Sequence, residues 1–100
     1  MIEIFKVDVE NDGCYFAKDT ESNWRTKQIS LDKLALEIYE KSQADTPLTG
    51  VKIIFPRTPQ INVLGHSSNM LLPVPGNEVL LFYRELLRCL YLNDPSHPEL

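Results

Sequence analysis

Residues 78–92 read EVLLFYRELLRCLYL and repeat their apolar side chains with the period of an α-helix. After Glu78 at its start, only Arg84, Glu85 and Arg88 mark a polar side. One apolar stripe contains Val79, Phe82, Tyr83, Leu86, Cys89 and Leu90. Three further residues, Leu80, Leu87 and Tyr91, widen this stripe to about 200° of arc. An apolar stripe of about 100° is enough for a helix on the surface of a globular protein. We therefore expect this helix to have two apolar neighbours, its own sheet and a second surface.

The second neighbour has two explanations. The helix is either enclosed between a sheet and another helix, or it presents part of its stripe to a second copy or another protein. A two-helix domain of this size has little interior with which to cover both sides of one helix, which favours the interface. Tyrosine is also enriched at interfaces. The candidate partner-binding residues are Leu80, Leu87, Tyr91 and Arg57.

The residues before this helix predict short strands and one further helix. Pro73-Val74-Pro75-Gly76 separates the last strand from the final helix, which we expect Asn77 to cap. Gly50 and Pro56 bound the clearest strand. Asn11-Asp12-Gly13 is typical of a hairpin turn. The predicted strands are 2–9, 14–18, 24–29, 51–55, 60–64 and 70–72, and the predicted helices are 31–43 and 78–92.

The first strand has an irregular apolar pattern. Ile2 and Ile4 share one face, while Phe5, Val7 and Val9 share the other. Either a β-bulge or burial on both faces accounts for this shift in phase. The sequence leaves the two explanations open.

The first helix has an ordinary amphipathic pattern. Ser30 is a good N-cap, and Asp32 lies in the first turn, where the helix dipole favours a carboxylate. Leu31, Leu34, Ala35 and Ile38 follow helical spacing, with Tyr39 beside them and Lys33, Glu37 and Glu40 opposite. The order β-β-β-α-β-β-α predicts an α+β fold, a small antiparallel sheet with two helices packed on it.

Composition sets the remaining limits. The 100 residues predict one α+β domain over 1–93 with a flexible tail over 94–100, and 43% hydrophobic residues are ordinary for a globular protein. A net charge of −4 argues against nonspecific nucleic-acid binding. No signal peptide or membrane span is expected, and the two cysteines, Cys14 and Cys89, are too few for a disulfide framework. A cytoplasmic location follows as the expectation.

Candidate chemistry is sparse. The Gly65–Asn69 loop, with His66, Ser67, Ser68 and Asn69, is a possible ligand site or small-enzyme site, although it lacks the second glycine of a nucleophile elbow. His66 and His97 lie far apart along the chain, and no ligand spacing predicts a metal. The glycines are scattered, so no phosphate-binding loop is present. We expect no cofactor and no catalytic residue.

A basic segment raises one further alternative. Trp24, Arg25 and Lys27 combine an aromatic ring with two cations, as single-strand nucleic-acid binders do. Strand alternation, however, puts Trp24 on the face opposite Arg25 and Lys27. The sequence therefore predicts a non-enzymatic interaction module, as a homodimer or with another protein. A small enzyme and a nucleic-acid-binding domain are the alternatives.

Overall fold

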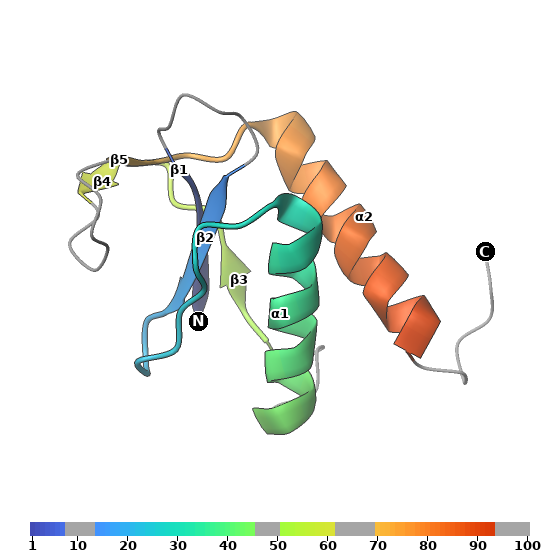
Figure 1. Ribbon diagram of the computed structural model, residues 1–100. Coiled ribbons are helices and arrows are strands. Elements are labelled where there is room, and N and C mark those ends of the chain that lie inside the picture. The colour runs from blue at the N-terminus through green and yellow to red at the C-terminus, as the bar shows by residue number, and fades with distance from the viewer. Residues whose placement is uncertain (8–13, 46–50, 62–69, 94–100) are drawn as a thin grey trace.

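The computed structural model describes residues 1–7, 14–45, 51–61 and 70–93, which form an α+β fold (Figure 1). The elements run β1 (Ile2–Val7), β2 (Tyr15–Asp19), α1 (Leu31–Asp45), β3 (Ile53–Ile54), β4 (Gln60–Ile61), β5 (Met70–Leu72) and α2 (Gly76–Asn93). The predicted fold class is confirmed. The hairpin turn at 11–13, residues 62–64 of the fifth predicted strand, the Gly65–Asn69 loop and the 94–100 tail lie outside the described residues.

Strand β1 is the centre of the sheet. Strand β2 pairs with it antiparallel from Ile2↔Asp19 to Lys6↔Tyr15. The other edge of β1 is divided between two strands, with β3 parallel to its start and β5 antiparallel to its end. Strand β4 then pairs with β5. The predicted antiparallel sheet therefore includes one parallel pair, because α1 returns the chain to the end of the sheet where β1 begins.

The irregular pattern of β1 reflects burial on both faces. Its register against β2 is continuous, so no bulge shifts the phase. Ile2 and Ile4 join the larger core cluster, whereas Phe5 and Val7 join a separate cluster with Phe16 and Leu71. These four apolar side chains of β1 are at most 3% exposed. The alternative of two-sided burial is thus confirmed.

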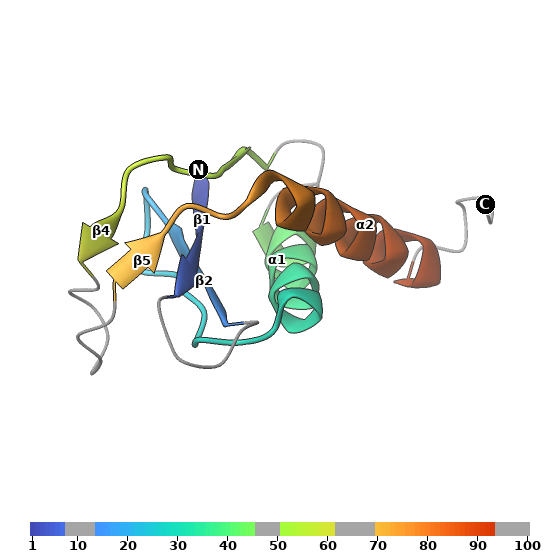
Figure 2. The same cartoon turned by 90° about the horizontal axis from the view of Figure 1, so that it is seen from above.

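Both helices lie on the face of the sheet that carries Ile2 and Ile4. The larger cluster joins Leu34, Ala35 and Ile38 of α1 to Phe82 and Leu86 of α2. Figure 2 shows the helices on one side of β1 and β2, with β4 and β5 at the end of the molecule remote from them. As predicted, Lys33, Glu37 and Glu40 on the outer side of α1 are exposed. Within the described residues, no helix is long and apolar enough to span a membrane.

Residues 24–29 do not form the predicted third strand. They pair with β2 through two isolated bridges, Tyr15↔Ile29 and Lys18↔Arg25, and not as a continuous strand. Ile29 lies four residues after Arg25, whereas their partners Tyr15 and Lys18 are only three residues apart. The register between the two segments therefore slips by one residue. Between the bridges, the buried Thr26 hydroxyl accepts the Ala17 N–H at 3.1 Å and donates to the Lys27 carbonyl at 2.7 Å. Because of the slip, Ile29 packs on the same cluster as Trp24, whereas strict strand alternation over 24–29 would place these two residues on opposite faces.

The ends of the helices differ slightly from expectation. The Pro75 carbonyl accepts the N–H groups of Glu78 and Val79, at 2.9 and 3.0 Å, and so occupies the cap position predicted for Asn77. Proline fixes its own φ angle, which suits the turn into the helix. Ser30 precedes α1 as predicted, and its hydroxyl donates to Asp32 Oδ1 at 2.6 Å. This hydrogen bond lowers the pKa of Asp32.

Glu78 attaches the first turn of α2 to the sheet. Its Oε1 lies 2.9 Å from Lys6 Nζ of β1 and accepts a short hydrogen bond from the Tyr15 hydroxyl of β2. Partial burial opposes the charged carboxylate, but these two partners outweigh it and lower its pKa from the ordinary value of 4.5. The N-terminal end of the helix also favours the negative charge. Glu78 therefore fixes the position of the first turn of α2 relative to β1 and β2.

Replacing Glu78 by Gln should lower the free energy of unfolding by about 1–2 kcal/mol at pH 7, because Lys6 loses its charged partner. A carboxylate with a lowered folded pKa contributes stability above its unfolded pKa and loses it as pH falls through the folded value. The difference between wild type and Glu78→Gln should therefore shrink below about pH 4.5. Urea denaturation from pH 7 to pH 3 measures it.

Glu37→Gln is the matched control, because Glu37 is exposed on α1 and should change the free energy by less than about 0.5 kcal/mol. A loss for Glu78→Gln that stays constant down to pH 3 would show that the charge of Glu78 does not stabilise the fold.

Candidate interaction surface

One edge of α2 completes the hydrophobic core. Phe82 and Leu86 are buried, and Val79, Cys89 and Leu90 pack partly buried against the same cluster. These five belong to the stripe predicted from the sequence. Burial and the nearby Glu85 carboxylate raise the pKa of the Cys89 thiol, which favours its protonated form. Cys89 thus lies at the margin of the core, packed against the larger cluster.

The remaining apolar residues of the predicted stripe face outward. Leu80 is 72% exposed, Leu87 49% and Tyr83 40%, and Tyr91 is partly exposed. These four residues, which we call the α2 ridge, fall within about 80° of arc on the helix. The alternative that the whole wide stripe is enclosed by the fold is therefore wrong for Leu80 and Leu87. Burying these side chains requires a surface beyond the described residues.

Phe55 borders the ridge on one side. Its ring meets that of Phe82 at 5.7 Å and that of Tyr83 at 5.9 Å, both edge-to-face. Phe82 and Tyr83 are themselves 5.3 Å apart. Edge-to-face contacts of this kind hold aromatic rings in defined orientations. Tyr83 is therefore fixed in place at the boundary between core and ridge.

Two arginines border the ridge on its other side. Arg84 and Arg88 are both exposed, one turn apart on α2. Neither forms a salt bridge with any residue in the described part of the chain. We call this pair the arginine flank. It leaves two positive charges beside an apolar surface.

The other candidate residues have different outcomes. Arg57 is exposed, two residues after Phe55, and no described contact engages it. The loop candidates His66, Ser67, Ser68 and Asn69 lie outside the described residues, so a site there stays a prediction. Among the residues the structure describes, no three His, Cys, Asp or Glu side chains come together as metal ligands.

Two exposed leucines of α2 were not singled out from the sequence. Leu81 is 46% exposed and Leu92 74%, and they lie on the side of the helix away from the ridge. Their spacing of eleven residues, three helical turns, is the signal that could have grouped them. Phe55 was predicted only as a strand residue, because a contact with α2 depends on the tertiary fold.

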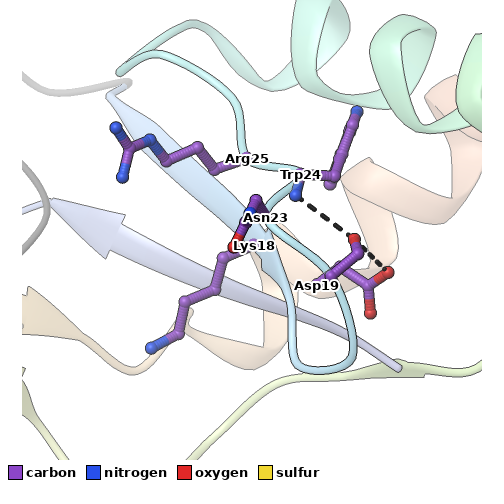
Figure 3. Close-up of a pocket in the computed structure, with 6 residues that line it drawn as sticks. Lys18, Asp19, Asn23, Trp24 and Arg25 are labelled. Carbon is purple, nitrogen blue, oxygen red and sulfur yellow. Dashed lines mark hydrogen bonds between the residues drawn. The ribbon is translucent and has the colours of Figure 1, made fainter.

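A polar hollow of about 300 Å³ lies beside β2 and is lined by Lys18, Asp19, Ser22, Asn23, Trp24 and Arg25 (Figure 3). Asp19 is saturated with partners. Its carboxylate accepts from the Glu21 N–H at 3.1 Å and the Ser22 hydroxyl at 2.9 Å, and the Met1 amino group lies 3.2 Å away. Partial burial opposes ionisation, but these partners outweigh it and lower the pKa of Asp19 to about 2. These contacts hold the Asp19 carboxylate ionised and tie the turn at Glu21 and Ser22 to the N-terminus.

The Trp24 ring lies apart from the side chains of Lys18 and Arg25 (Figure 3). In Figure 3 its ring points towards α1, whereas Lys18 and Arg25 extend away on the opposite side. Lys41 Nζ of α1 lies 5.2 Å from the centre of the ring. The predicted opposition of Trp24 and Arg25 is confirmed, so these two side chains do not form a shared platform for stacking bases.

Comparison with known proteins identifies no relative: no family, characterised protein or solved structure matches the chain.

The neighbouring leucines of α2 test the division between core and ridge. Leu86→Ala should lower the free energy of unfolding by about 2–5 kcal/mol, because Leu86 is 6% exposed and its removal leaves a cavity. Leu87→Ala deletes the same atoms from an exposed site and should cost less than about 1 kcal/mol. Equal losses in urea denaturation would mean that the ridge belongs to the core.

Proposed function

We propose that this protein is a non-enzymatic interaction module, an adaptor, inhibitor or regulatory subunit, that binds through the α2 ridge. The observation that supports this most is the exposure of Leu80 and Leu87 on a helix whose opposite edge already completes the core. Exposed leucines grouped on one side of a helix are typical of a helical binding surface. A second copy of the chain or another protein would bury them.

The setting of the ridge supports the same proposal. Tyr83 is held by Phe55 and Phe82, so it loses little conformational freedom when a partner covers it. Tyrosine and arginine are both enriched at protein interfaces, and the arginine flank lies directly beside the leucines. Arg57, two residues from Phe55, would lie at the rim of the contact.

The chemistry of the chain supports a reducing compartment. Cys14 and Cys89 are both free thiols in the structure. Reduced cysteines are usual in the cytosol, where thiols are kept from forming disulfides. The proposal therefore includes a cytoplasmic location.

Site-specific photocrosslinking tests the proposal in cells. A photoreactive phenylalanine at position 87 should give a discrete crosslinked product, because Leu87 would lie within the contact. The same group at position 37, on the exposed outer face of α1, serves as the control and should give none. Leu80→Arg should remove the product without unfolding the protein, since Leu80 is 72% exposed.

The mass of the crosslinked product identifies the partner. A product twice the mass of the chain identifies a homodimer, and any other mass identifies a different protein. No product at position 87, or the same products at positions 87 and 37, would contradict the proposed function.

A further inference from the structure

The ridge has the spacing of a helix-pairing seam. Leu80, Tyr83, Leu87 and Tyr91 follow at intervals of three, four and four residues, so they stay on one side of α2 for three turns, about 16 Å. Their arc of about 80° is narrower than the stripe with which a helix packs on a whole core. Apolar residues spaced three and four positions apart form the contact between two helices that pack side by side. The shape therefore fits a single helix lying along α2.

The two sides of this seam are unlike. On the side of Tyr83, the seam continues into Phe55 and the core of the protein itself. On the other side Arg84 and Arg88 are exposed, with no salt bridge to a described residue. In paired helices, the charged positions beside the seam select the partner. On α2, the side towards Tyr83 is occupied by the core of the protein itself, so only the arginine flank can contact charged residues of a partner helix.

The acidic residues of α2 are on the wrong side to neutralise this flank. Glu78 is engaged with Lys6 and Tyr15 against the sheet. Glu85 is partly buried and lies about 160° around the helix from the middle of the ridge. The exposed arc of α2 thus carries two positive charges and no negative charge, although the chain as a whole has a net charge of −4.

From this arrangement we infer that the α2 ridge binds an acidic amphipathic helix of another protein. The inference rests on the proposed function and names the partner's chemistry. Apolar side chains of the partner cover Leu80 and Leu87, and its Asp or Glu residues pair with Arg84 and Arg88. Arginine binds carboxylates through two parallel hydrogen bonds, so this pairing also fixes the register of the partner.

A second copy of the chain is a poorer occupant. In a two-fold dimer the same patch meets itself, so the arginine flank of one copy would approach that of the other. The exposed arc of α2 offers no carboxylate to separate these four charges. Like charges brought together at an interface disfavour that partner. Charge complementarity therefore selects a different, acidic chain.

Two synthetic helical peptides of about 18 residues, five turns, test the inference. They share one leucine seam and differ only beside it, where one carries Glu and the other Lys. At about 50 mM salt, the full-length protein should bind the Glu peptide at least about ten-fold more tightly. The difference should shrink at about 500 mM salt, where exposed charges are screened. Fluorescence anisotropy of labelled peptide measures both.

Charge reversal supplies the specific control. Arg84→Glu with Arg88→Glu should reverse the preference, so that the Lys peptide binds more tightly. Lys27→Glu with Lys33→Glu makes the same change in net charge at exposed positions outside α2, and should leave the preference unchanged. A preference that follows net charge in both double variants would overturn the inference.

The remaining outcomes separate this inference from the proposed function. Equal binding of both peptides, or binding of neither, overturns the acidic partner. A dimer in light scattering that Leu87→Arg dissociates also overturns it, but leaves contact through the α2 ridge standing. If position 87 also gives no photocrosslink in cells, both proposals fail together.

Discussion

Every side of β1 is occupied, and the rest of the structure is arranged around that constraint. One edge is paired with β2 over its length, and the other is divided between β3 and β5. Ile2 and Ile4 fill one face, while Phe5 and Val7 fill the other. Six residues therefore join two apolar clusters and three strands. A strand used in this way cannot shift its register by one residue, because that would exchange the two sets of side chains.

The constraint also explains the position of α2. Lys6 is the one polar β1 side chain on the helix face, and it pairs there with Glu78 in the first turn of α2. Phe82 and Leu86 then pack on the cluster that contains Ile2 and Ile4. One edge of α2 is fixed by these contacts, so the direction in which Leu80 and Leu87 face is fixed as well. The exposed ridge is a consequence of how the helix is attached.

Local patterns in the sequence predict much of this fold. The period of Leu34, Ala35 and Ile38 predicts α1, and the phase shift at Phe5 indicates two-sided burial as one of two explanations. The amino-acid pattern alone also reveals the excess of apolar residues on α2. The candidate surface residues Leu80 and Leu87 come from that pattern, and both are exposed.

Features that depend on distant contacts could not be predicted. The slip at Thr26 depends on its hydroxyl meeting Ala17, nine residues earlier in the chain. The contact of Phe55 with Tyr83 and the pairing of Glu78 with Lys6 join residues 28 and 72 positions apart. These contacts determine which side of α2 is buried. Among the described residues, no carboxylate pairs with the arginine flank, because the two glutamates of α2 lie elsewhere on the helix.

Helix α2 is divided lengthwise into a buried edge and an exposed apolar ridge. Hydroxyl-radical footprinting of the monomeric wild-type protein, read residue by residue by mass spectrometry, tests this without any substitution. Leu80 and Leu87 should be oxidised nearly as fast as in an unfolded peptide, while Phe82 and Leu86 should be protected. Protection of Leu80 and Leu87 equal to that of Phe82 would contradict the account, because the ridge would then be part of the core.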